Sequence, residues 1–89
     1  MKILTVCGLG QGTSLLLRMN VEEVLNELKI QAEVDHMDVS YAASENAELI
    51  LTSPQLAPLL ERNPAQKIII NNYFDKNEIK EKLKEYFNI

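Results

Sequence analysis

The chain has 89 residues, of which 46% are hydrophobic and 25% charged, and its formal net charge is −4. These values are ordinary for a single globular domain, and the acidic balance disfavours nonspecific binding of nucleic acid or of an anionic membrane. The single cysteine, Cys7, excludes an internal disulfide. The sequence has no secretory signal and no apolar run near the about 20 residues of a membrane span. We therefore expect a cytoplasmic protein with a reduced thiol and no direct membrane insertion.

Short apolar runs alternate with helical patterns along the chain. Unbroken runs rich in Ile, Leu and Val are typical of parallel strands that are covered on both faces. We expect such strands at 3–6, 49–51 and 68–70, and a more polar edge strand at 32–37.

The segment 14–29 is predicted to form an amphipathic helix, and Thr13 or Ser14 is placed to cap it. Its apolar stripe follows helical spacing and consists of Leu17, Val21, Val24, Leu25 and Leu28.

The segment 75–87 is predicted to form the last helix, because Asp75 and Glu78 fit the acidic variant of a capping box. Its buried face should consist of Ile79, Leu83, Tyr86 and Phe87.

The middle of the chain carries weaker patterns. Segment 39–47 is long enough only for a short, irregular crossover. Ser53 and Pro54 resemble a helix start, and Pro58 would then either kink that helix or mark a later start.

Alternating strands and helices with short loops predict an α/β fold, a three-layer α/β/α sandwich of Rossmann-like type. Right-handed crossovers leave few topologies, and we expect a four-stranded parallel sheet in the order 2-1-3-4. Ligands of such sheets bind beyond the carboxyl ends of the strands, at the switch point, where Cys7 would lie. Ser53, Asn71 and Asn72 follow neighbouring strands and should lie at the same edge.

The turn after the first strand is the most informative feature of the sequence. It carries all three glycines of the chain, at positions 8, 10 and 12, and a helix follows it. A glycine-rich turn before a helix exposes backbone N–H groups that bind anions, and the same groups favour a thiolate. The alternative is that Cys7 is a small buried hydrophobic residue at a strand end. We favour a nucleophile beside a phosphate site.

Several known glycine-loop chemistries do not fit this spacing. The loop has no lysine for a Walker A motif, and its glycines are one residue short of a dinucleotide fingerprint. A thiol phosphatase loop would place arginine at position 13, where Thr13 stands, and a Cys-x-x-Cys redox site needs a second cysteine. The remaining interpretation is a protein that accepts a phosphoryl group, holds it and passes it on, with no cofactor.

His36 is the only histidine, and we interpret it as a surface or structural residue rather than a phosphate carrier. A metal site that combines His36 with Asp35 and Asp38 is disfavoured, because consecutive strand residues such as Asp35 and His36 point to opposite faces, and we expect no metal. Arg18 lies about one turn into the first helix, where it either reaches the phosphate or a partner, or is solvated.

The segment from Cys7 to Ser14, placed directly after an N-terminal strand and before a helix, resembles the loop of enzyme IIB components of the bacterial phosphoenolpyruvate:sugar phosphotransferase system. Within the lactose/ascorbate/galactitol group the loop is most similar to the ascorbate type. The resemblance covers the whole chain in length and element order, so residues 1–89 would form one IIB domain. Its specific part is the loop alone.

This resemblance implies that Cys7 accepts a phosphoryl group from a phosphohistidine of an enzyme IIA. Cys7 would then pass it to a sugar, ascorbate-like or related, held by a membrane enzyme IIC. The phosphate-binding loop that the resemblance implies consists of Gly8, Leu9, Gly10, Gln11, Gly12, Thr13 and Ser14.

Two alternatives remain open at this point. One is a non-catalytic IIB-like regulatory module, for which the loop would look the same. The other is a thiol phosphatase or an enzyme like arsenate reductase, which the missing loop arginine and missing second cysteine disfavour.

Overall fold

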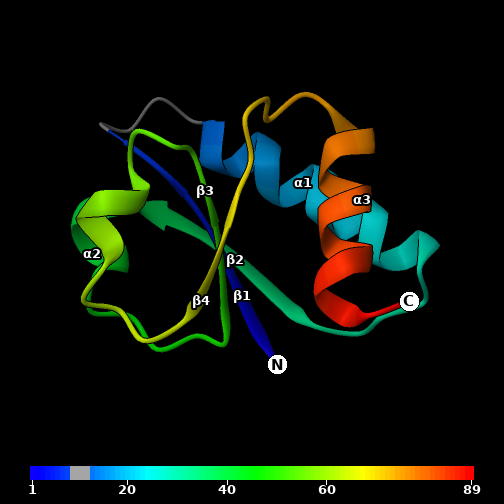
Figure 1. Cartoon of the computed structure of the whole chain (residues 1–89), viewed down its shortest axis with the longest axis horizontal. Helices are drawn as coiled ribbons and strands as arrows, with labels where there is room; N and C mark the ends of the chain where they lie inside the picture. Colours follow the sequence, from blue (N-terminus) through cyan, green and yellow to red (C-terminus); the bar gives the residue numbers. More distant parts are fainter. Residues whose placement is uncertain (9–12) are drawn as a thin grey trace.

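The computed structural model describes residues 1–8 and 13–89, apart from the side chains of Thr13 and Ser14. Its central sheet lies between α2 on one side and α1 and α3 on the other (Figure 1). In chain order the elements are β1 (Lys2–Cys7), α1 (Thr13–Glu27), β2 (Glu33–Asp38), α2 (Val39–Ala42), β3 (Leu49–Thr52), the 3₁₀ helix η1 (Ala57–Leu60), β4 (Gln66–Ile69) and α3 (Lys76–Phe87).

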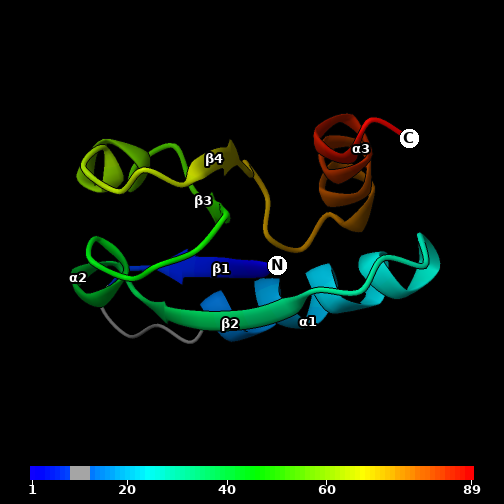
Figure 2. The same ribbon diagram turned by 90° about the horizontal axis from the view of Figure 1, so that it is seen from below.

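The described part of the chain forms a four-stranded parallel sheet in the order β2-β1-β3-β4, which confirms the predicted topology. The second view shows the strands stacked in this order, with the helices on both sides (Figure 2). β1 pairs with β2 along its whole length, up to Cys7 and Asp38. Its pairing with β3 ends earlier, at Thr5 and Leu51. β4 begins at Gln66, two residues before the predicted start.

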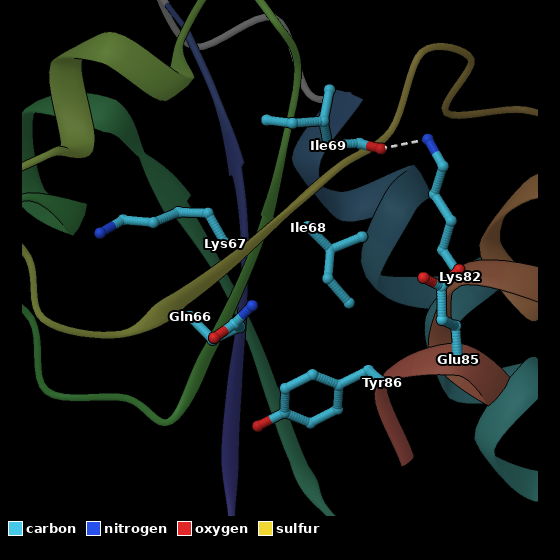
Figure 3. A pocket seen from close by; sticks show the side chains of 7 residues that line it. All are labelled: Gln66, Lys67, Ile68, Ile69, Lys82, Glu85 and Tyr86. Atoms are coloured by element: carbon cyan, nitrogen blue, oxygen red, sulfur yellow. Dashed lines mark hydrogen bonds between the residues drawn. The ribbon is translucent and has the colours of Figure 1, made fainter. Parts of the chain in front are cut away.

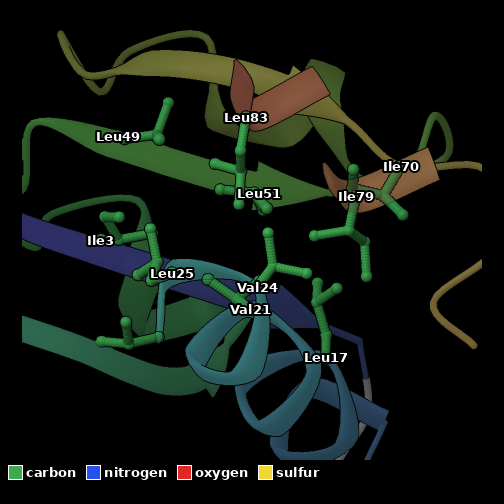
Figure 4. Packing of buried hydrophobic residues seen from close by; sticks show 11 residues of the cluster. Ile3, Leu17, Val21, Val24, Leu25, Leu49, Leu51, Ile70, Ile79 and Leu83 are labelled. Carbon is green, nitrogen blue, oxygen red and sulfur yellow. The ribbon is translucent and has the colours of Figure 1, made fainter. Parts of the chain in front are cut away.

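Each face of the sheet has its own apolar cluster. The side chains of α1, α3 and one face of the sheet interdigitate in the larger cluster (Figure 4). It contains the predicted stripe residues Leu17, Val21, Val24, Leu25, Ile79 and Leu83, all buried, with Leu28, Tyr86 and Phe87 packed at its border. The second cluster joins the other face to α2 and η1 through Leu4, Val6, Ala42, Ile50, Leu60 and Ala65. The helical spacing of the apolar residues therefore predicted the core correctly.

Helix α1 ends two residues before the predicted boundary, in a turn that contains no glycine. Lys29 adopts a left-handed conformation with φ 58°, and Ile30 N donates to the carbonyl of Leu25, 2.9 Å away. Lys29 N donates to Asn26, which completes a Schellman motif. Because Ile30 packs on the same cluster as Leu25, this turn fixes where the chain enters β2.

Helix α3 is capped as predicted at only one of the two positions. The carboxylate of Asp75 accepts hydrogen bonds from Asn77 N and Glu78 N. The carboxylate of Glu78 does not accept a hydrogen bond from the backbone N–H group of Asp75, which donates to the carbonyl of Asn72 instead. It accepts from the backbone N–H groups of Asn71 and Asn72, at 2.7 and 2.9 Å, and so ties the β4–α3 connection to the helix.

The middle of the chain follows the later of the two predicted helix starts. α2 is a single turn, as expected for the crossover. No helix begins at Ser53; the chain turns after Pro54, and η1 begins at Ala57 with Pro58 in its first turn. Because proline lacks an N–H group, it is tolerated there, where that group would be unpaired.

Candidate functional site

Cys7 is the last residue of β1, and 4% of its surface is exposed. The strand ends at the carboxyl edge of the sheet, and α1 begins at Thr13, so the predicted order of strand, loop and helix is present. In parallel α/β sheets this edge is where ligands bind. The only thiol of the chain therefore lies where the fold places a site.

Of the predicted phosphate loop, the structure describes Gly8 and the backbone of Thr13 and Ser14. Leu9, Gly10, Gln11 and Gly12, with the side chains of Thr13 and Ser14, lie outside the described residues. Gly8 is described, and a Cβ added to it would lie 3.3 Å from Cδ2 of Leu56. The connection between β3 and η1 thus packs against the start of the loop, a neighbour that the sequence did not indicate.

Tyr73 reaches the same edge from the connection between β4 and α3. Its hydroxyl donates a hydrogen bond to the carbonyl oxygen of Val6, 2.8 Å away and directly before Cys7. Burial raises the pKa of Tyr73; the hydroxyls of Thr52 and Ser53 lower it, and the charge of Cys7 raises it. Because the net shift is upward, the Tyr73 hydroxyl stays protonated at neutral pH and remains a donor.

Tyr73 itself carries no local sequence signal of a site. The only signal was that Asn71 and Asn72 were expected at this edge, one or two residues away. The backbone N–H groups of both asparagines are occupied by Glu78. This turn therefore offers a ligand fewer donors than its sequence suggests.

Ser53 follows the carboxyl end of β3, as predicted, and Thr52, which was not predicted there, is the last residue of this strand. Thr52 is fully buried, and its Oγ1 has no hydrogen-bond partner of good geometry among the described residues. A buried hydroxyl without a good hydrogen bond lowers the stability of the fold. The hydroxyls of Thr52 and Tyr73 therefore form a polar spot in the interior at the carboxyl edge.

Arg18 points toward β2. Its Nη1 lies 3.1 Å from Nδ1 of His36 and 3.9 Å from Oδ1 of Asp35, and its Nε lies 3.6 Å from Glu22. Asp35 and His36 were expected on opposite faces of the strand, yet one guanidinium reaches both. The reason is that the Asp35 carboxylate folds back to accept a hydrogen bond from His36 N, 2.8 Å away. His36 therefore links β2 to α1 through Arg18.

A separate pocket of about 620 Å³ lies between β4 and α3 (Figure 3). Its lining includes Lys82, whose ammonium group donates to the carbonyl oxygen of Ile69 and lies 2.7 Å from Glu78. The positive charge of Lys82 is therefore already paired, and the pocket does not include Cys7.

Residues 1–8 and 13–89 hold neither a candidate metal site nor a helix that could span a membrane. These residues contain no group of three or more His, Cys, Asp or Glu side chains that could hold a metal ion. None of their helices has the length and apolar character that crossing a membrane requires.

Comparisons with known proteins point to one family. Residues 2–85 match the family model described as "PTS system, Lactose/Cellobiose specific IIB subunit". An ascorbate-specific PTS system EIIB component of Mycoplasma pneumoniae is 33% identical over 84 residues, which cover 91% of this chain and 88% of the relative. The component of the same name from Shigella sonnei is 38% identical over 58 residues, 63% of this chain and 57% of the relative.

The fold of the chain also resembles that of a solved IIB domain. The lactose-specific IIB domain of Streptococcus pneumoniae matches with a TM-score of 0.65 at 18% identity, over 99% of this chain and 95% of that one. At this identity the likeness establishes the α/β fold alone, whereas the family model covers nearly the whole sequence. The chain therefore belongs to the IIB components of the sugar phosphotransferase system, in the lactose/cellobiose family.

Proposed function

We propose that Cys7 carries the phosphoryl group of this IIB component. The thiolate attacks the phosphorus of a phosphohistidine on an enzyme IIA, so that the P–N bond breaks as a P–S bond forms. The phosphoryl group then passes to a hydroxyl of a sugar held by a membrane enzyme IIC, and the thiolate is regenerated. The observation that carries this proposal is the position of the only thiol, at the carboxyl end of β1 before the glycine loop and α1.

The phosphate-binding role of Gly8, Leu9, Gly10, Gln11, Gly12, Thr13 and Ser14 is part of the same proposal. The N–H groups of the loop and of the first turn of α1 would hold the phosphate, with help from the helix dipole. The names of the relatives support ascorbate or a related sugar as the substrate.

The experiment is intact mass spectrometry after incubation with phosphoenolpyruvate, the general phosphocarrier proteins and a cognate IIA. We expect one phosphoryl group per chain in the wild type and in His36→Asn, and none in Cys7→Ser. His36→Asn is the matched control because it removes the only histidine. Phosphate on His36, with Cys7→Ser still modified, would overturn the assignment.

Variants of the loop test its proposed role in binding phosphate. We expect Gly10→Val and Gly12→Val to slow phosphorylation far more than they lower global stability, because a β-branched side chain blocks the approach of backbone to phosphate. Acceptance of phosphate at the wild-type rate by both variants would show that the loop is not the site.

The transport role needs its own readout. Phosphorylated protein should lose its phosphoryl group when membranes containing the cognate IIC are supplied with the sugar, and ascorbate should be the first sugar tested. A phosphorylated protein that never discharges to any sugar but changes its affinity for a regulator would instead support the regulatory alternative.

A further inference from the structure

β1 extends beyond the point where its neighbour β3 supports it. The last β1 residue with a partner on β3 is Thr5, so Val6 and Cys7 continue without that neighbour. Val6 is completely buried, and a buried carbonyl without a hydrogen bond is destabilising. The hydroxyl of Tyr73 satisfies this carbonyl from 67 residues away in the sequence, at 2.8 Å.

The Val6 carbonyl belongs to the peptide group that ends at the nitrogen of Cys7. Because the peptide group is planar, a bond that fixes this carbonyl also fixes the direction of the Cys7 N–H group. Tyr73 thus adds a second constraint, beside the pairing with β2, on the backbone at the residue that carries the thiol.

Tyr73 is itself anchored to α1. Asn20 is 7% exposed, and its Nδ2 donates to the backbone carbonyl of Tyr73, 2.9 Å away. The neighbouring turn is held as well, since Phe74 N donates to Oδ1 of Asn72. One residue therefore contacts both the strand that enters the loop and the helix that leaves it.

Resting on the proposed function, we propose that Tyr73 is a positioning residue for phosphoryl transfer: by bridging Val6 and Asn20 it sets the separation of the two ends of the loop that begins at Cys7. The hydroxyl must be protonated to donate to Val6, and its burial favours the protonated form at neutral pH. Loss of the Tyr73 hydroxyl would leave the Val6 carbonyl without this donor, so the end of β1 would lose its link through Tyr73 to α1.

The test compares Tyr73→Phe with Tyr86→Phe. Both tyrosines are half-buried, and both changes remove only a hydroxyl, but Tyr86 lies on α3 at the border of the larger cluster, away from Cys7. We expect Tyr73→Phe to lower the single-turnover rate of phosphocysteine formation about tenfold, if the full value of the hydrogen bond to the Val6 carbonyl serves to position the thiol. Tyr86→Phe should stay within about twofold of the wild type.

A second readout separates positioning from simple destabilisation and needs no phosphodonor. The rate of Cys7 alkylation is measured against pH, well below the unfolding temperature of each variant. We expect this profile to change in Tyr73→Phe, because the carbonyl that precedes Cys7 is no longer held, and to stay unchanged in Tyr86→Phe.

Wild-type transfer rates and an unchanged alkylation profile in Tyr73→Phe would overturn the proposal. Equal effects of the two variants would overturn it too, because they would reflect stability alone. Asn20→Ala provides an independent variant: combined with Tyr73→Phe, it should slow transfer less than the product of the two single effects, since both changes break one bridge. If the wild type accepts no phosphoryl group, the proposed function fails, and the alkylation profiles still decide the role of Tyr73.

Discussion

Arg18 donates from Nη1 to Nδ1 of His36, across 3.1 Å between α1 and β2. An arginine has no acceptor, so this hydrogen bond requires the tautomer of His36 in which Nδ1 is the acceptor. The contact joins the helix that follows the loop to the edge strand. It turns the guanidinium toward β2, so the structure gives Arg18 a bridging role between two elements.

We therefore expect Arg18→Ala to lower the free energy of unfolding by about 1 kcal/mol or less, since its partners are partly exposed. Phosphorylation of Cys7 should stay within about twofold of the wild type. Denaturant titration and single-turnover kinetics measure the two effects, with the exposed Arg62→Ala as the control. A large loss of transfer in a fully stable Arg18→Ala protein would instead place the guanidinium on the phosphate.

Thr52→Val should change stability by less than about 1 kcal/mol, because the buried hydroxyl makes no hydrogen bond of good geometry in the described structure and only its contact with Tyr73 is lost. The matched control is Thr5→Val. Thr5 is equally buried, but its hydroxyl donates to the carbonyl of Asp35 at 3.3 Å, so this change should be destabilising by about 1 kcal/mol. Thermal unfolding of both variants gives the comparison; a clear loss of stability in Thr52→Val would show that its hydroxyl is bonded in solution.

Glu78 makes the stability of the protein depend on acid pH. Burial alone would raise its pKa, but hydrogen bonds from Asn71, Lys82 and Asn72 lower it to about 2. Because the folded pKa lies below the unfolded value near 4.5, the stabilisation is complete above about pH 4.5 and is lost as the pH falls toward 2.

Glu78→Gln should therefore be less stable than the wild type by about 1–2 kcal/mol at pH 7, the value of hydrogen bonds to a charged acceptor. The difference should shrink between pH 4.5 and 2 as the wild-type carboxylate is protonated. Glu81→Gln, an exposed position on the same helix, is the control and should show little effect at either pH. A pH-independent difference between Glu78→Gln and the wild type would contradict the assignment of the carboxylate as the stabilising form.

Gly8→Ala should fold, at a cost of up to about 1 kcal/mol, because its new Cβ would lie 3.3 Å from the end of the Leu56 side chain. Leu56 is half-buried and can shift by the few tenths of an ångström required. A double-mutant cycle with Leu56→Ala checks the cause. The penalty of Gly8→Ala should disappear in the Leu56→Ala background, and strictly additive effects would place the strain elsewhere.

Local sequence patterns predicted the helices and strands of this fold well, because the spacing of apolar residues directly reflects which face of each element is buried. The spacing of Leu17, Val21 and Val24 identifies the buried face of α1, and short apolar runs identify the strands. The handedness of crossovers then leaves few sheet orders, so the position of Cys7 at the carboxyl edge followed. The boundaries were less accurate: α1 ends at a turn whose left-handed residue, Lys29, carries none of the glycine signal.

Contacts across the fold could not be predicted from these patterns. Tyr73 lies in a loop, and nothing near it in the sequence indicates that its hydroxyl reaches Val6. Glu78 was expected to complete a cap at its own helix, but two N–H groups of the preceding turn bind its carboxylate more favourably. Such partners are chosen by tertiary packing, which local propensity does not encode.

The bond from Lys82 to Ile69 has a consequence for how the molecule behaves in a crowded solution. Ile70 N donates inward to Thr52, so the carbonyl of Ile69, one residue earlier, faces away from β3, on the open side of the last strand. The unpaired backbone groups of an edge strand can hydrogen-bond to a strand of another chain, and lysine side chains commonly protect such an edge. A strand arriving at β4 would meet an ammonium group in place of a free acceptor, so Lys82 should help to keep the sheet from growing into aggregates.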